Sequence, residues 1–349
     1  MRRARMGALH VGDSRLNYHA GKSHGPVVEE IEGLIRFYKD GHVDRLPAIP
    51  DVPCAWALDA DIACRDEVID HSTGVWARIY MPKLQGKLPL LIYFHGGGFC
   101  VASAAWSCYH KFLIRLALLA KCIIVSVNYR LAPENRLPAA YNDGLTVLRW
   151  LRQQASCSHS DGHAWWRNHS NFSRVFLGGD SAGATIAFNV ATQVGLLGAT
   201  EPQVLKPVCL RGVILIQPFF GAESRTSSEK YLAQSSRSAL TLATSDCYWR
   251  MALPTGSNRD HPWCNPMAKA SPKLEDLRLP PVFVCISEMD ILRDRNLEFC
   301  KAMKRAGKSV EQATYAGVGH AFQILHNYHL SQARTHEMLT HINVFITNR

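Results

Sequence analysis

The sequence lacks any long hydrophobic run. The most apolar windows are residues 88–94, which are too few to cross a bilayer, and residues 113–127, which contain Arg115 and Lys121. Charged residues are also few, since 19% of the 349 residues are Asp, Glu, Lys or Arg and 47% are hydrophobic. These proportions are ordinary for a globular protein and exclude disordered and collagen-like chains. We therefore expect a folded protein with no membrane-spanning helix and no membrane partner.

The spacing of a disulfide framework or a zinc site is missing as well. The sequence has 11 cysteines, an odd number, scattered from Cys54 to Cys300 without a Cys-x-x-Cys pair. His326 and His329 have the spacing of two ligands on one helix, but no third metal ligand accompanies them. We expect reduced thiols and no metal ion.

Acidic residues are outnumbered by basic ones. The 39 Lys and Arg and the 29 Asp and Glu give a net charge of +10, and residues 1–25 alone hold five basic residues and one acidic residue. We expect residues 1–25 to form a flexible basic tail and expect no nucleic-acid partner, with a nucleic-acid surface as the alternative. The tail is rich in Arg like a transit peptide but lacks the apolar stretch of a secretory signal. We expect a cytoplasmic location, with import into an organelle as the alternative.

Internal repeats are absent, and short β-like runs alternate with longer helical patterns through most of the chain. This order predicts an α/β domain with a mostly parallel central sheet and helices on both faces. We expect strands at residues 75–80, 90–94, 122–127, 174–177, 212–216, 282–286 and 311–315. We expect helices at residues 109–120, 139–154, 182–194, 292–306 and 331–346.

Two segments do not fit the alternation. Residues 26–70 begin with a short amphipathic piece at 29–38 and continue into a proline-rich stretch, and residues 218–275 are a long excursion rich in Ser, Pro and Trp. Insertions of that length in a compact α/β domain are usually functional. We predict that residues 26–349 form one domain in which both segments contribute to a cap over the strand ends. Tyr248 and Trp249 are candidate pocket residues on this cap, and burial against the core is the alternative.

A G-x-S-x-G pattern lies between an expected strand and an expected helix. It consists of Gly179, Asp180, Ser181, Ala182 and Gly183. An apolar run leads into the pattern and a helical pattern leads out of it, which is typical of the sharp turn that exposes a nucleophilic serine above a sheet. Ser181 is the candidate nucleophile. A glycine-rich turn with an N-capping serine is the alternative.

Three consecutive glycines follow a histidine after the expected strand 90–94. The motif consists of His95, Gly96, Gly97 and Gly98. Glycine permits the backbone to approach a developing alkoxide closely, so we expect the N–H groups of Gly97, Gly98 and Ala182 to face an oxyanion. We interpret His95 as a structural anchor of the loop, with a catalytic base as the alternative. Phe99 comes next and either narrows one side of the pocket or packs under the loop.

A serine nucleophile needs a base, and the base needs an orienting carboxylate. Asp290 follows the expected strand 282–286, and His320 lies in a glycine-flanked loop after the strand 311–315. We predict that these two residues complete a triad. Glu288 is expected too close to the strand end and Asp294 already on a helix. The other downstream histidines lie on or beside the last helical pattern: His326, His329, His336 and His341.

Five motifs follow one another in an order that is typical of one family. They are HGGGF at 95–99, VNYRLAPE at 127–134, GDSAG at 179–183, the Asp290 loop and GHAF at 319–322. With them, the sequence from residue 27 to residue 349 resembles the plant carboxylesterases of the hormone-sensitive-lipase-like branch of the α/β hydrolases. The resemblance implies the α/β-hydrolase fold and a serine hydrolase that cleaves small carboxylic esters without a metal or organic cofactor. The expected partner is a small-molecule ester, and the oligomeric state is not predicted.

The same branch includes two classes with other functions. Gibberellin receptors resemble the esterases but lack the catalytic histidine, whereas this sequence has His320. The 2-hydroxyisoflavanone dehydratases commonly place Thr where this sequence has Ser181. Both differences favour hydrolysis over a hormone receptor or a dehydratase or cyclase, which are the alternatives. Asn135 and Thr185 stand where relatives often carry His and Asn, so details of the pocket are expected to differ.

Overall fold

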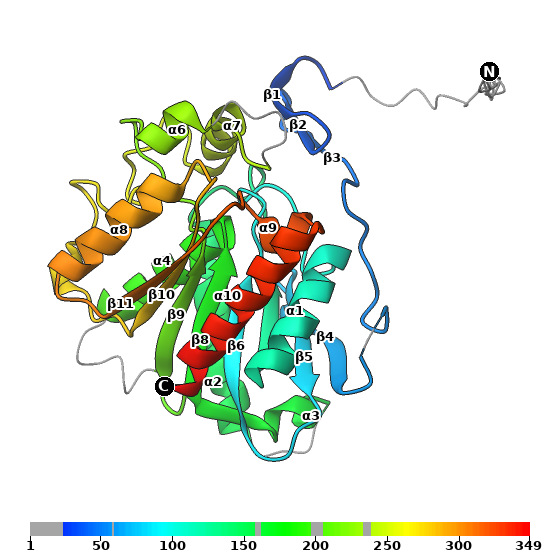
Figure 1. The fold of residues 1–349 in the computed structure, drawn as a ribbon. Helices are drawn as coiled ribbons and strands as arrows, with labels where there is room; N and C mark the ends of the chain where they lie inside the picture. The colour runs from blue at the N-terminus through cyan, green and yellow to red at the C-terminus, as the bar shows by residue number, and fades with distance from the viewer. Residues whose placement is uncertain (1–23, 58, 158–161, 197–204, 233–238) are drawn as a thin grey trace, which may run out of the picture.

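An eight-stranded sheet forms the centre of the molecule (Figure 1). The computed structural model describes residues 24–57, 59–157, 162–196, 205–232 and 239–349, so most of the expected tail, residues 1–23, lies outside the described residues. The strands are β4 (Ile62–Asp70), β5 (Val75–Pro82), β6 (Leu88–Phe94), β7 (Ile123–Asn128), β8 (Ser170–Asp180), β9 (Leu210–Ile216), β10 (Val282–Ser287) and β11 (Val310–Tyr315). Their order is β11-β10-β9-β8-β6-β7-β5-β4. Every neighbouring pair in the run β11-β10-β9-β8-β6-β7 is parallel, whereas β5 is antiparallel to both β7 and β4. These pairings confirm the mostly parallel sheet.

Helices cover both faces of the sheet, as the sequence predicts. One face carries α1 (Ser107–Ala120) and α10 (His329–Thr347), and the other carries α2 (Ala139–Ser156), α4 (Ala182–Leu196) and α8 (Arg293–Arg305). The other helical segments are α3 (Ala164–Arg167), α6 (Ser227–Tyr231), α7 (Leu242–Ala252), the 3-10 turn Leu274–Asp276 and α9 (Phe322–Leu325). Each of the five longer helices that the sequence predicts is therefore present.

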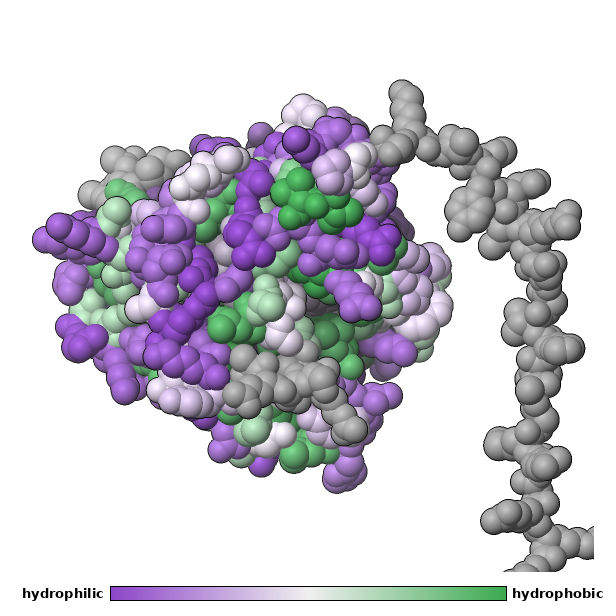
Figure 2. Space-filling view, turned by 90° about the horizontal axis from the view of Figure 1, so that it is seen from above, coloured by the Kyte–Doolittle hydropathy of each residue, from purple (hydrophilic) through white to green (hydrophobic). Residues whose placement is uncertain are grey.

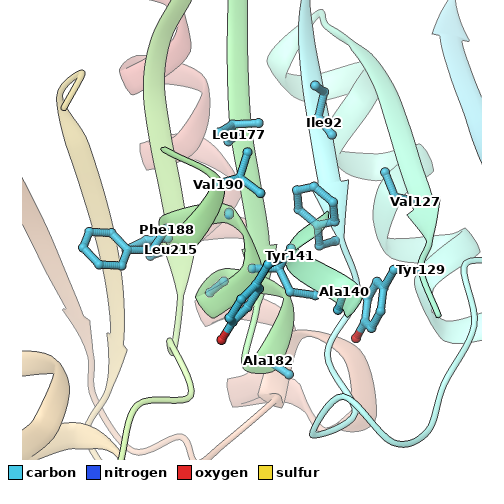
Figure 3. Packing of buried hydrophobic residues seen from close by; sticks show 14 of the residues in the cluster. Ile92, Val127, Tyr129, Ala140, Tyr141, Leu177, Ala182, Phe188, Val190 and Leu215 are labelled. Carbon is cyan, nitrogen blue, oxygen red and sulfur yellow. The ribbon is translucent and has the colours of Figure 1, made fainter. Parts of the chain in front are cut away.

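The two cores of the molecule use alternate residues of the same strands. Ile92 of β6 packs toward α2 and α4, whereas its neighbour Tyr93 packs toward α1 and α10. Figure 3 shows the first of these cores, where Ile92, Leu177 and Leu215 of neighbouring strands lie near Val190 of α4. Full burial of one such aliphatic side chain contributes about 1.5–3 kcal/mol. The resulting rigid sheet fixes the loops at the carboxyl ends of its strands.

A small antiparallel sheet precedes the central one. It contains β1 (Val27–Ile31), β2 (Ile35–Tyr38) and β3 (Val43–Arg45), so the amphipathic piece 29–38 forms most of a hairpin. The expectation for the whole segment 26–70 is corrected at its end, because β4 pairs with β5 in the central sheet. β4 is an edge strand with two exposed polar side chains, Arg65 and Asp66, and Asp66 forms an ion pair with the buried Arg78 of β5. The polar pattern of an edge strand explains why the sequence does not reveal it.

Two ion pairs connect the small sheet to the rest of the molecule. Glu29 of β1 accepts two hydrogen bonds from Arg250 of α7, at 2.6 and 2.8 Å. Arg45 of β3 donates two to Glu134, each at 2.6 Å, and one each to the backbone oxygens of Cys100 and Ala132. The small sheet therefore lies near both α7 and the loop that follows β6. No helix of the described residues is long and apolar enough to span a bilayer.

Candidate active site

Ser181 occupies a sharp turn between β8 and α4. Its φ is +51°, in the left-handed region that side chains with a Cβ rarely adopt. Glycine is required at Gly183, where a Cβ would lie 1.9 Å from the backbone oxygen of Phe94, and at Gly179, where it would lie 2.5 Å from the backbone of Gly183. The elbow is therefore pressed against the end of β6, and the serine side chain rises above the sheet.

The side chain of His320 lies within hydrogen-bonding distance of both Ser181 and Asp290. The Nε2 atom of His320 is 3.0 Å from Ser181 Oγ, and its Nδ1 atom is 2.7 Å from Asp290 Oδ2. When Asp290 is ionised it can only accept a hydrogen bond, so this geometry suits the tautomer with the proton on Nδ1, which leaves Nε2 as an acceptor for the serine hydroxyl. All three side chains are buried. The structure thus brings together the three residues that the sequence singles out for a triad.

The two rival carboxylates point elsewhere. Glu288 accepts a hydrogen bond from the backbone N–H of Gly317 at 2.8 Å and so supports the loop of His320 rather than its imidazole. Asp294 lies on α8 and accepts the backbone N–H of Ser228 at 2.7 Å. Asp290 is held by the backbone N–H of Leu292 at 3.0 Å. Among these three carboxylates, Asp290 is the one within hydrogen-bonding distance of His320.

The glycine loop after β6 lies beside Ser181 and His320. Gly97 and Gly98 have φ values of +96° and +58°, and a Cβ on Gly97 would lie 2.3 Å from the backbone oxygen of Val101. Both glycines line one cavity together with Ser181 and His320. Ala182 begins α4, where backbone N–H groups have no partner within the helix. The two backbone segments expected to hold an oxyanion, the glycine loop and the start of α4, therefore meet beside Ser181.

His95 is buried beneath this loop. Its Nδ1 atom is 2.8 Å from the backbone oxygen of Gly96, and its ring stacks on Tyr129 with centroids 4.3 Å apart. Burial lowers the pKa of His95 to about 4, so the imidazole is neutral at ordinary pH. This environment fits the anchoring role expected of His95.

Asp180 connects the elbow to the glycine loop. Its carboxylate accepts hydrogen bonds from the hydroxyls of Tyr93 and Tyr109, at 2.8 and 3.0 Å, and from the backbone N–H of Gly96 at 3.1 Å. Burial raises the pKa of Asp180 to about 6. The sequence singles out Asp180 only as part of the serine motif, and no motif signals the two tyrosines.

The cavity above Ser181 has a volume of about 120 Å³ and a mostly apolar lining. Its walls come from the glycine loop and α1, from the N-terminal segment, from residues 239–248 and from the loop of His320. Among the described residues that line it, none is Lys or Arg. A larger cavity of about 300 Å³ lies against α4, but its lining includes none of Ser181, His320 and Asp290. Reactive groups, not size, therefore identify the candidate site.

The three aromatic pocket candidates have different positions. Tyr248 of α7 lines the cavity, and its ring lies so close to Gly98 that a Cβ there would be 2.2 Å from Tyr248 Cγ. Phe99 and Trp249 are not among the cavity's lining residues, which corrects the pocket assignment of both. Their rings are 5.4 Å apart, and Trp249 stacks on Phe219 at 4.7 Å. Aromatic packing behind the wall accounts for their burial.

Known proteins are similar to this chain in both sequence and fold. The family profile described as alpha/beta hydrolase fold matches residues 91–324. The chain is 46% identical to a probable carboxylesterase of Arabidopsis thaliana over 93% of this chain and 92% of the relative. It is 35% identical to a 2-hydroxyisoflavanone dehydratase of Glycyrrhiza echinata over 85% of this chain and 90% of the relative, and 36% identical to a gibberellin receptor of Arabidopsis thaliana over 71% and 73%.

A solved structure agrees with the sequence relatives. A thermophilic carboxylesterase cloned from a metagenomic library superposes with a TM-score of 0.68 at 26% identity, over 83% of this chain and 92% of that protein. The expected resemblance and the expected fold are confirmed. The chain belongs to the alpha/beta hydrolase fold family, and within it to the branch that contains plant carboxylesterases, 2-hydroxyisoflavanone dehydratases and gibberellin receptors.

Proposed function

We propose that this protein is a carboxylesterase that hydrolyses small, uncharged carboxylic esters with short acyl chains. The observation that carries the proposal is the relay from Ser181 Oγ through His320 to Asp290, with distances of 3.0 and 2.7 Å, at the floor of an apolar cavity. Serine hydrolases use the same three roles on unrelated folds, so the geometry rather than the chain order supports the assignment.

The reaction has two steps, acylation and deacylation. Ser181 Oγ attacks the ester carbonyl while its proton passes to Nε2 of His320, and the C=O becomes an oxyanion. Collapse of this intermediate breaks the C–O bond to the alcohol, which takes the proton from Nε2 and leaves an acyl-serine. Water then attacks the acyl group in the same way and releases the carboxylic acid. Asp290 holds the imidazole in orientation and stabilises the imidazolium in each step.

The oxyanion is assigned to backbone N–H groups of Gly97, Gly98 and Ala182. Such donors are preorganised when the backbone cannot relax, and the left-handed glycines packed against Val101 and Tyr248 make relaxation costly. Loss of one oxyanion donor typically costs about 10²–10³ in rate. Glycine is needed in this loop because a side chain would clash, and the same close packing keeps the N–H donors rigid.

The lining of the cavity supports the substrate class. Without Lys or Arg in the described lining, a carboxylate or phosphate group on the substrate would be desolvated without a cationic partner, which is costly. An uncharged ester carries no such penalty. The volume of about 120 Å³ favours short acyl groups over lipid chains. In Figure 2 apolar and polar side chains are interspersed among the described residues of the upper face, and these residues form no broad apolar surface for lipid docking.

We assign the roof of the cavity to the two cap segments. Leu34, Ala48 and Ile49 from the N-terminal segment and Tyr248 from the excursion 218–275 line the cavity. The ion pair of Glu29 with Arg250 joins these two segments. A cap of this kind places substrate discrimination on segments outside the central sheet while the triad remains on the sheet's loops.

An activity-based probe tests this function. A fluorophosphonate should label the wild-type protein at Ser181, and 4-nitrophenyl acetate should be hydrolysed with release of one acetate for each nitrophenol. Ser181→Ala is the matched control and should take up no label. A folded wild-type protein that neither reacts with the probe nor hydrolyses the acetate contradicts the esterase and favours binding without turnover. Labelling at a serine other than Ser181 contradicts the triad.

A further inference from the structure

Gln217 lies at the point where the three loops of the triad meet. It follows β9 directly, is 1% exposed and has a φ of +48°, in the left-handed region. Its backbone N–H donates to the oxygen of Cys285 in β10 at 2.8 Å. A buried polar side chain in a strained backbone position persists only where its surroundings hold it, and such positions often have a function.

The backbone on both sides of Gln217 holds the nucleophile. The N–H of Ser181 donates to the oxygen of Ile216 at 2.8 Å, and the N–H of Phe219 donates to the oxygen of Ser181 at 3.1 Å. Both backbone polar groups of the serine are therefore bound to the segment 216–219. Movement of this segment would move the serine.

The side chain of Gln217 reaches the other two loops. Its Oε1 atom accepts the backbone N–H of Ala321 at 2.7 Å, and Ala321 directly follows His320 with a φ of +54°. Its Nε2 atom donates to Ser287 Oγ at 2.6 Å. Ser287 ends β10, and its backbone oxygen accepts the N–H of Asp290 at 3.4 Å. One amide thus supports the loops of both the base and the carboxylate.

We propose that Gln217 is a positioning residue that fixes His320 and Asp290 relative to Ser181, an inference that rests on the proposed esterase function. The amide acts by supplying one acceptor to the His320 loop and one donor to the Asp290 loop at the same time. It does not touch the substrate, since it is absent from the cavity lining. A buried Ala321 N–H left without its acceptor would shift or take up other partners, and His320 would move with it.

The direct test replaces Gln217 by a residue of similar length without hydrogen bonds. Gln217→Met should lower kcat for 4-nitrophenyl acetate by about 10²-fold, because misplacement of a reacting group by about 1 Å costs that much, while KM stays within about threefold. Gln323→Met is the matched control, since Gln323 is buried in the same cluster and its Nε2 atom has no hydrogen-bond partner among the described residues. Its Oε1 atom accepts only a long hydrogen bond from Gln217 Nε2, at 3.4 Å, so the change leaves the two short hydrogen bonds of Gln217 in place. The control should keep kcat within about twofold of wild type.

A second variant and a spectroscopic signal separate positioning from general stability. Gln217→Glu keeps an acceptor for the Ala321 N–H and should recover part of the kcat lost in Gln217→Met. The strongly deshielded proton between His320 Nδ1 and Asp290, seen by proton NMR, should weaken or shift in Gln217→Met and stay unchanged in Gln323→Met. Should Gln217→Met fail to fold, Ser287→Ala and Gln217→Glu take its place, and each should lower kcat more than the control.

Two results overturn the inference. One is a folded Gln217→Met with kcat within threefold of wild type and an unchanged proton signal. The other is an equal loss of kcat in Gln323→Met. A wild-type protein without esterase activity contradicts the proposed function instead, and the proton signal of the His320–Asp290 pair then still decides whether Gln217 positions it.

Discussion

The carboxylate of Asp180 accepts the backbone N–H of Gly96 at 3.1 Å, so the residue before the nucleophile holds the loop that carries the oxyanion glycines. Tyr93 and Tyr109 donate to the same carboxylate from β6 and α1. A Cβ on Gly96 would lie 2.7 Å from Asp180 Oδ2, so the contact also requires glycine at this position. The serine elbow and the glycine loop therefore form one unit, and a change in the charge of Asp180 acts on both.

Asp180 should give the protein a pH-dependent stability. Burial raises its pKa from an ordinary value of 3.8 to about 6, so between these values the folded protein holds a proton that the unfolded chain has lost. Stability due to this group therefore falls as the pH rises from 4 to 6, by about 3 kcal/mol in all. Asp180→Asn cannot ionise, so urea unfolding at pH 4, 5, 6 and 7 should show the wild type losing stability relative to the variant. Parallel curves for the two proteins contradict this prediction.

Removal of the nucleophile or the base should abolish ester hydrolysis. Ser181→Ala and His320→Ala each remove one half of the same proton transfer, so each should cost nearly all of kcat, and the double variant should be scarcely slower than either. The measurement is the initial rate with 4-nitrophenyl acetate after folding is checked by circular dichroism. Retention of more than about a tenth of the wild-type rate in folded Ser181→Ala contradicts the assignment, since catalytic triads lose far more.

Asp290 rather than Glu288 should be the essential carboxylate. Asp290→Asn removes the charge that selects the imidazole tautomer and should cost on the order of 10⁴ in kcat, as the same change does in serine proteases. Glu288→Gln is the matched control, because its side chain contacts the backbone of Gly317 and not the imidazole. A larger loss in Glu288→Gln than in Asp290→Asn would reverse the assignment of the two carboxylates.

A strand whose side chains are buried on both faces is the easiest element to predict from the sequence. The run of β6 is apolar throughout, and the structure confirms a strand there with seven buried residues. β4 escapes prediction because only one of its nine residues is fully buried, and partly exposed edge strands lack a continuous apolar run. The expected strand 174–177 recovers only the middle of β8, since β8 continues to Asp180 and directly into the elbow.

The reactive residues can be found from the sequence, but their supports cannot. Ser181, His320 and Asp290 each stand after a predicted strand in a motif with a known chemical logic. Gln217 shows no such motif, and its partners Ser287 and Ala321 are 70 and 104 residues away along the chain. Phe99 shows the opposite error, because an aromatic residue beside a reactive loop suggests a pocket wall although it packs behind that wall. Contacts of this kind depend on how strands pair, which local sequence does not encode.

The preferred acyl chain should be short, and the cap should set its length. The prediction rests on the cavity of about 120 Å³ and on Leu34 and Tyr248, which line it. Each buried methylene gains about 0.8 kcal/mol until the cavity is full, after which overpacking reverses the trend. In a series of nitrophenyl esters with acyl chains of about two to sixteen carbons, kcat/KM should therefore peak between acetate and hexanoate. Leu34→Ala should move the peak toward longer chains, whereas Leu84→Ala, a change at an exposed surface residue, should leave it in place. A wild-type maximum at dodecanoate or beyond would mean that the cavity opens into a channel for lipid chains.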